Sequence, residues 1–343
     1  MDQAGNPSGV GGAKIRAFFI QKRGAGTSRF VHYPRPIPVM RPPASKAKAP
    51  ARLPSALRLG RHLGRLYESG LRTYRGKRAA CGRAMSRHAV HQARVAIRRL
   101  LAGLELLGAL PGKPPEVRKL LRRELKTLGE LRNVQIQLQR IDDEPQLTAV
   151  LEPLRRHLRK REQRREKAAR KALKSTKAMQ RLKRWARPPA PEDHRLLPRL
   201  RRLMDIKLQR AFDPMAAFSP STPADSAVRH RARVLSREYR YMAEALRPRW
   251  RGCEPRRFVT NLQAYQEIIG QIHDRELLLH RIDRSVADGR IQAASIRAFC
   301  NRLHSEKTKL LKACAQLDRW MLHEAMLARR HLRQHPPSNS TTA

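Results

Sequence analysis

Two rows of basic side chains recur in the sequence at the spacing of a helical face. Their members are Arg87, His91, Arg94 and Arg98 in the first row and His230, Arg233, Arg237 and Arg240 in the second. Residues three or four apart lie on one face of an α-helix, so each row sets one histidine beside three guanidinium groups. Guanidinium groups bind phosphate oxygens through several N–H donors, and a neighbouring anion favours the protonated imidazole. The rows are therefore candidate polyanion-binding residues; the alternatives are a solvated basic face and neutral histidines that bridge helices.

The two rows belong to a longer repeat within the chain. The pattern His-x-Ala-Arg-Val begins at His91 and again 139 residues later at His230. A weaker similarity relates the two segments that follow, 120–138 and 261–279. It aligns Gly129 with Gly270. Repeats of this length predict two related helical units about a pseudo-twofold axis, with their basic rows lining one shared groove.

Further basic residues flank the first row. We assign four of them to the same groove: Arg99, Arg122, Arg123 and Lys126. The last three lie on the next expected helix, where Arg123 and Lys126 share a face with Lys119, and simple solvent exposure is the alternative for them. The segment 154–185 holds 15 Lys and Arg and two acidic residues. We expect its middle to project beyond the core, either as a solvated helix or as a second polyanion-binding surface.

The whole chain carries the same bias towards positive charge. Its 343 residues include 75 Lys and Arg against 28 Asp and Glu, a formal net charge of +47. A charge of this size indicates a polyanionic partner, such as nucleic acid, anionic lipid or a phosphate polymer. Aromatic residues make up only 5%, which disfavours base-stacking surfaces for single-stranded nucleic acid. A phosphate polymer fits these features, and nucleic acid bound without sequence specificity is the alternative.

The sequence lacks the signatures of catalytic and metal sites. His323 and Glu324 begin a zinc-protease pattern, but Leu327 stands where its second histidine would be. The four cysteines form no CxxC pair, and neither a GxSxG motif nor a complete phosphate-binding loop occurs. We therefore expect a binding protein, not an enzyme, without cofactor or metal. The chain also shows no signal-peptide pattern and no apolar run of membrane-spanning length, which favours the cytoplasm.

Prolines and apolar periodicity divide the chain into tails and helices. Residues 1–52 are Pro-rich and basic and 334–343 are polar, so we expect both segments to be disordered. Between them, proline-free stretches carry apolar residues at helical spacing, which predicts an all-α domain over 53–333. The expected helices cover about 55–80, 86–109, 115–141, 145–186, 192–212, 225–246, 255–286 and 292–333. Their predicted packing is two four-helix bundles, 53–190 and 191–333.

The repeated segments resemble the CHAD family, the conserved-histidine α-helical domains. The family's first signature, VHQxRVAxRRLR, nearly matches residues 90–100, and a second, HxxRxxxKRLRY, is partly present at 230–241. A following LGxxRD-type segment corresponds to 128–133. The resemblance covers residues 55–333. It implies two four-helix bundles with a basic central groove, inorganic polyphosphate as the partner, and a location at polyphosphate granules in the cytoplasm.

The chain departs from the family pattern at several positions. Glu238 stands where the second signature usually has Lys or Arg, and Leu101 where the first often has Arg. Asn133 replaces the Asp of the usual Arg-Asp pair, whereas the second copy keeps Asp274. These differences predict unequal contributions from the two halves. Many family members also carry a triphosphatase-like domain with an ExExK motif, which this sequence lacks, so the expected function is non-catalytic binding of polyphosphate. The sequence leaves the oligomeric state open.

Overall fold

The part of the chain that the structure describes is helical throughout. The computed structural model describes residues 56–109, 117–184, 195–216, 226–247 and 256–334. Its elements are α2 (Ala56–Arg83), α3 (Arg87–Leu107), α4 (Val117–Asp142), the 3-10 helix η1 (Pro145–Leu147), α5 (Thr148–Lys174), α6 (Lys177–Arg184), α7 (Leu196–Ala216), α8 (Ser226–Leu246), α9 (Arg256–Ala287) and α10 (Ala293–Gln334). No strand occurs among these residues, so the predicted all-α class is confirmed. The predicted N-terminal tail lies outside the described residues, as does the predicted C-terminal tail beyond Gln334.

The helix α3 shows how the local sequence fixes an element that carries one basic row. Ser86 has an extended backbone, and its side chain caps the helix by accepting a hydrogen bond from the amide of Ala89 at 3.2 Å. The buried residues of α3 recur every three or four positions, among them Val90, Ala93, Ile97, Leu100 and Leu104. This apolar stripe is the one expected from the sequence, and its burial leaves the basic row on a different face of the helix.

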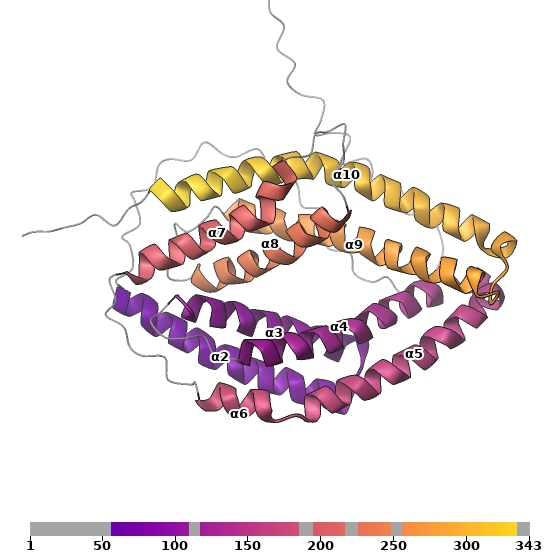
Figure 1. The fold of residues 1–343 in the computed structure, drawn as a ribbon, viewed down its shortest axis with the longest axis horizontal. Helices are drawn as coiled ribbons and strands as arrows, with labels where there is room; N and C mark the ends of the chain where they lie inside the picture. The colour runs from indigo at the N-terminus through magenta and orange to yellow at the C-terminus, as the bar shows by residue number, and fades with distance from the viewer. Residues whose placement is uncertain (1–55, 110–116, 185–194, 217–225, 248–255, 335–343) are drawn as a thin grey trace, which may run out of the picture. The chain divides into compact units, whose positions relative to one another are not determined.

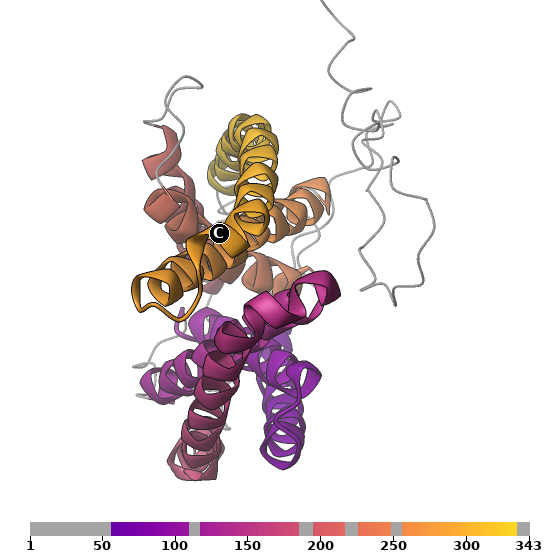
Figure 2. The same cartoon turned by 90° about the vertical axis from the view of Figure 1, so that its right-hand side faces the viewer.

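The helices form two sets that meet through α3 and α8. Within the first set α2 packs against α3, α3 against α4 and α4 against α5, and the order α7, α8, α9, α10 repeats this pattern in the second. Between the sets, α3 packs against α8 and α4 against α9. Figures 1 and 2 show the two sets one above the other, with the indigo-to-magenta helices below the orange-to-yellow ones. The two helices that carry the basic rows therefore lie at the junction, while the duplication itself stays a prediction.

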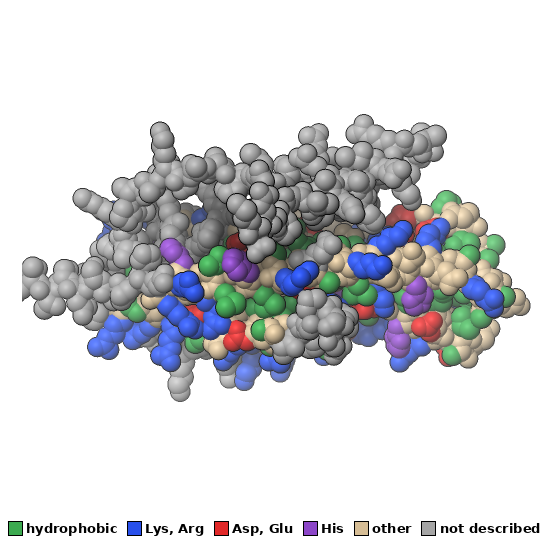
Figure 3. All heavy atoms as spheres, turned by 90° about the horizontal axis from the view of Figure 1, so that it is seen from above, with side chains coloured by type: hydrophobic (Ala, Val, Ile, Leu, Met, Phe, Trp, Pro, Cys, Tyr) green, Lys and Arg blue, Asp and Glu red, His purple; other side chains and the backbone are tan. Residues whose placement is uncertain are grey.

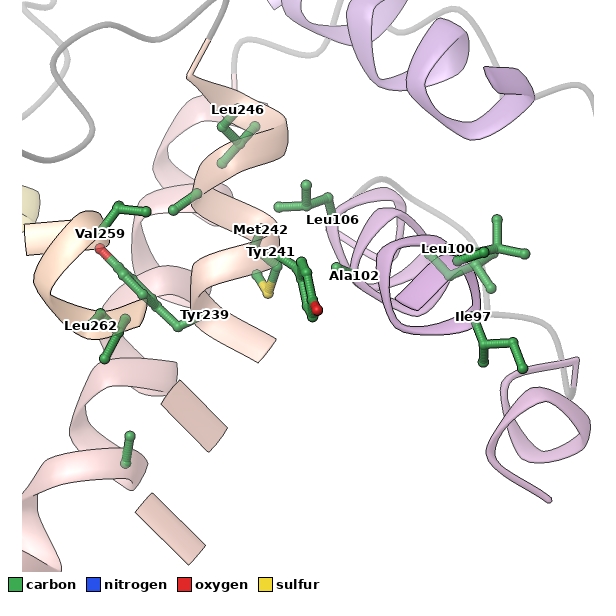
Figure 4. Close-up of a cluster of buried hydrophobic side chains, with 14 of the residues drawn as sticks. Ile97, Leu100, Ala102, Leu106, Tyr239, Tyr241, Met242, Leu246, Val259 and Leu262 are labelled. Atoms are coloured by element: carbon green, nitrogen blue, oxygen red, sulfur yellow. The ribbon is translucent and has the colours of Figure 1, made fainter. Parts of the chain in front are cut away.

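Two hydrophobic cores join the halves. The larger one runs through both sets, and Figure 4 shows Ala102 and Leu106 of α3 opposite Tyr241 and Met242 of α8. The smaller core is built by the second half of α4, the first half of α5, the second half of α9 and the start of α10. Its residues are Val134, Leu138, Ile141, Leu151, Leu154, Leu158, Leu278, Leu279, Ile282, Ile291, Ile296, Phe299 and Leu303. Each half thus completes a core with helices of the other half.

The long helix predicted over 145–186 is wrong in one respect, because the structure divides it into α5 and α6. Ser175 has an extended backbone (ψ 120°), which ends the α-helical hydrogen bonding before Lys177. The middle of α5 lies outside the core, as expected, although it stays against α4. Between Leu158 and Ala169 no residue is buried, but Arg165 pairs with Glu130 and holds this stretch against α4.

The predicted break between the helices 255–286 and 292–333 is confirmed. Gly289 has a φ of 67°, the left-handed conformation that glycine adopts without steric cost, and it lies between α9 and α10. The turn reverses the chain, so that α10 packs against α9. None of the described helices has both the length and the apolar character that a membrane span requires.

Candidate functional site

The packing of α3 against α8 brings the two basic rows together. Burial, followed by the positive charges of Arg98 and Arg132, lowers the pKa of Arg94 to about 9, and Arg233 of the other half adds to this effect. Burial and the charges of Arg98 and Arg233 likewise lower the pKa of Arg237 to about 9. These guanidinium groups are close enough to repel one another, and all stay charged at pH 7. We call Arg94, Arg98, Arg233 and Arg237 the central arginine cluster.

Two members of the cluster make similar contacts in the two halves. Arg94 donates from Nη1 to the carbonyl oxygen of Gly129 at 3.3 Å, and Arg233 donates from Nε to the carbonyl oxygen of Gln266 at 3.2 Å. The guanidinium of Arg94 lies over Gly129 and that of Arg233 over Gly270. The two glycines are the pair that the sequence repeat aligns. The approach of an arginine to the aligned glycine is common to both halves, whereas the two carbonyl acceptors are not aligned positions of the repeat.

The absence of a Cβ at Gly270 determines where Arg233 can lie. A Cβ built there would be 2.7 Å from Nη2 of Arg233, so Gly270→Ala should push this guanidinium out of the cluster. We expect a several-fold loss of polyanion affinity with stability little changed, because the end of an arginine side chain can move. Gly103→Ala is the control, since nothing lies within 4 Å of its Cβ, and it should stabilise the helix by about 0.5–1 kcal/mol without altering binding. Equal binding by the two variants, measured by calorimetry, would contradict this role of Gly270.

Arg98 and Arg240 have partners of their own at the junction. Burial lowers the pKa of Arg98, while a hydrogen bond to the side chain of Tyr241 opposes the shift. Arg240 donates from Nε to Oε1 of Gln266 at 3.1 Å and from Nη1 to Oε1 of Glu244 at 2.8 Å. Its charge is therefore partly neutralised by Glu244, with which it forms an ion pair.

The two row histidines lie beside cations that disfavour their protonation. His91 is exposed, but partial desolvation of its ring lowers its pKa, and the charges of Arg132, Arg94, Arg98 and His88 add to the shift. The pKa of His230 is lowered by burial and then by His273, Arg233 and Arg237, while Glu276 opposes. The rings of His230 and His273 lie 4.9 Å apart between centroids and line the same pocket. Both row histidines are therefore mainly neutral at pH 7.

The remaining predicted residues lie away from the central arginine cluster. Arg87 pairs with Asp142 at 3.3 Å. Arg99, Arg122, Arg123 and Lys126 are exposed, and none of them contributes to the lowered pKa values of the cluster. The structure thus brings together both histidines and five of the row arginines, whereas the part that these outer residues play in binding stays a prediction.

Sequence reasoning missed two residues of the junction that the repeat could have identified. Arg132 lies beside His91, and His273 lies beside His230. Arg132 precedes Asn133 and His273 precedes Asp274, which are aligned positions of the repeat. Each row histidine therefore has a basic neighbour from the following helix of its own half.

The second half contributes a carboxylate where the first half has an amide. Burial raises the pKa of Asp274, while the charges of Arg233, His273, Arg140 and Arg132 lower it. Its negative charge also opposes the lowered pKa values of Arg94 and Arg132. Asn133 has no charge to supply at the aligned position, so the halves have different electrostatic roles here.

Glu238, which departs from the usual basic residue, belongs to an ion cluster between the halves. Lys207 of α7 donates from Nζ to Oε2 of Glu238 at 2.9 Å and lies 3.2 Å from Oε1 of Glu105 on α3. Arg118 of α4 also pairs with Glu105. An acidic residue at 238 therefore balances Lys207 at the junction.

The fold and these contacts define an all-α protein with a cationic junction between two helical sets. The model of the CHAD domain family matches residues 65–283. The chain therefore belongs to the CHAD family, as the resemblance of its motifs predicts. No protein in the comparison with curated proteins matches it.

Two solved structures have a similar fold. The CHAD domain from the plant Ricinus communis is 23% identical, with a TM-score of 0.56, and the match covers 84% of this chain and 96% of that one. PptA from Streptomyces chartreusis is 18% identical, with a TM-score of 0.54, and the match covers 82% of this chain and 100% of that one. At these identities the likeness establishes the fold.

Proposed function

We propose that the chain binds inorganic polyphosphate, without catalysis, at the central arginine cluster. The observation that carries this proposal is the convergence of four guanidinium groups from the two halves, whose pKa values are lowered by burial and by neighbouring positive charges. Such a cluster raises the free energy of the unoccupied protein, and a bound polyanion would relieve the repulsion. The family's association with polyphosphate and the low aromatic content support a phosphate chain as the ligand.

A flexible phosphate chain suits this site because it presents charge without bases. Arg94 and Arg233 use one N–H group each on a backbone carbonyl, which orients the guanidinium and leaves its other N–H donors for phosphate oxygens. The row histidines would gain protons beside the phosphates and add donors. Among the described residues no group of three or more His, Cys, Asp or Glu side chains could hold a metal ion.

A competition experiment tests this function against general charge attraction. Lys and Arg side chains are spread over the face drawn in Figure 3, so weak binding of any polyanion is expected at low salt. Long-chain polyphosphate should displace DNA and RNA of equal charge, and its preference should persist at high salt because buried contacts are screened less than surface contacts. Equal displacement in both directions at all salt concentrations would instead identify a non-specific nucleic-acid-binding protein. We further propose that the chain associates with cytoplasmic polyphosphate granules, which a fluorescent fusion tests by its position relative to stained granules.

Polyphosphate affinity should rise as the pH falls. The pKa values of His91 and His230 lie below 6.5 in the unoccupied protein, and a bound anion raises them, so binding takes up protons. As the pH falls, the affinity should begin to rise near the pKa values that the two histidines have in the complex. It should stop rising below the lower pKa values that they have in the free protein. Calorimetry in buffers of different ionisation enthalpy measures the uptake. The double variant His91→Gln with His230→Gln should flatten the pH dependence of the affinity. The control, His304→Gln with His323→Gln at exposed positions, should leave it unchanged. Equal proton uptake on binding by both variants would make the row histidines structural.

A further inference from the structure

A second group of cations lies on the smaller core, away from the central arginine cluster. Arg161 belongs to α5 and Arg281 to α9, so the two side chains come from different halves of the chain. Leu158, three residues before Arg161, and Ile282, next to Arg281, are both buried in that core. Arg281 follows Asp274 by seven residues, which places it about 10 Å further along α9.

Both arginines have a buried N–H group without an acceptor. The Nε atoms of Arg161 and Arg281 are shielded from solvent and make no hydrogen bond within the described part of the chain. Neither side chain forms an ion pair with a described acidic residue. A buried guanidinium N–H without a partner is costly, so this pair is incomplete as it stands.

The surroundings of the pair are also positive. Burial lowers the pKa of Arg281, and the charges of Arg161 and Arg284 add to the shift. His157, one turn before Arg161, has its pKa lowered by burial and by Arg290, Arg281 and Arg161. Nη1 of Arg290 lies 3.0 Å from Nδ1 of this histidine. The nearby carboxylate of Asp288 pairs with Arg290 at 3.0 Å and is half exposed.

We propose that Arg161 and Arg281, with Arg284 and Arg290 beside them, form a second anion-binding site that takes a phosphate group. Two arginines from facing helices supply N–H donors for the oxygens of one tetrahedral anion, and the anion would satisfy the two buried Nε groups and cancel the repulsion. The phosphate could belong to a polymer or to a small free molecule, since the chemistry of recognition is shared. This site does not depend on the central arginine cluster binding anything.

The test uses the full chain and pyrophosphate as the probe, at constant ionic strength. Arg161→Gln with Arg281→Gln is compared with the exposed pair Arg319→Gln with Arg330→Gln, which removes the same charge from α10. Without anion, the first variant should unfold at a temperature equal to or above that of the control, because repulsion is relieved. With pyrophosphate, it should lose about tenfold in affinity, and most of the increase in unfolding temperature, relative to the control.

Two results would overturn the second site. The first is an equal increase in unfolding temperature on adding pyrophosphate to both variants. The second is that, without anion, Arg161→Gln with Arg281→Gln unfolds at a lower temperature than the control variant, which would make the pair structural. The same affinities are then measured with long-chain polyphosphate. A loss of affinity confined to the polymer assigns the phosphate to a chain, and a loss of affinity for pyrophosphate and orthophosphate assigns it to a small molecule. The same measurements in an Arg98→Gln with Arg237→Gln background separate the two sites, because only the proposed function predicts that this background weakens polymer binding.

Discussion

Replacing Arg98 and Arg237 by glutamine should reduce the affinity for long-chain polyphosphate by roughly a hundredfold or more. Each guanidinium supplies charge-assisted hydrogen bonds worth about 1.5–3 kcal/mol, and each comes from a different half of the chain. The slope of log affinity against log salt should also become shallower by about one for each phosphate group that no longer meets an arginine. In the absence of ligand the variant should unfold at a higher temperature, since burial and repulsion by Arg98 and Arg233 lower the pKa of Arg237 in the wild-type protein.

The opposite signs of these two effects distinguish a binding site from a structural one. Arg319→Gln with Arg330→Gln is the matched control, since it removes the same charge from exposed positions and should alter affinity only slightly. Arg122→Gln with Arg123→Gln measures the contribution of the outer residues assigned to the groove from the sequence. A loss of similar size in all three pairs would show that binding is diffuse over the surface and would reject the central arginine cluster as the site.

Asp318→Asn should cost about 3–5 kcal/mol of unfolding free energy, the largest stability loss we expect from a single substitution. Asp318 accepts from Nε of Arg229 at 3.4 Å and from the hydroxyl of Tyr265 at 2.7 Å. Arg229 is only 5% exposed, so removing the carboxylate leaves a buried charge without its counter-ion. Urea unfolding measures the change in stability, and Asp143→Asn at an exposed position is the control.

A second substitution tests this explanation. Adding Arg229→Met to Asp318→Asn should recover much of the missing stability, because the uncompensated charge is then removed. Arg229 precedes His230, so the single variant should also weaken polyphosphate binding by disturbing the row. Two results would contradict the role of this ion pair as a structural support of α8. One is a destabilisation by Asp318→Asn of less than about 1 kcal/mol, well under the usual cost of breaking a buried ion pair. The other is no recovery of stability in the double variant.

The sequence by itself determined the helices, apart from the break between α5 and α6, and the content of each row. Apolar spacing from Val90 to Leu104 depends only on helical periodicity, which a local window reveals, and the structure buries that stripe. Ser86 and Gly289 mark boundaries through local backbone preferences. The family also follows from contiguous motifs, which is why the resemblance and the family match agree.

Only the tertiary structure decided which charges meet. Arg122 and Arg94 both belong to basic rows at helical spacing, yet Arg122 is exposed and Arg94 is partly buried, because α3 packs against α8. The roles of Arg132 and Asp274 likewise depend on the packing of α4 against α9. Arg161 and Arg281 come together through a core shared by both halves, far apart in the chain. Desolvation and charge repulsion act through space, so no periodicity within one helix could have predicted these partners.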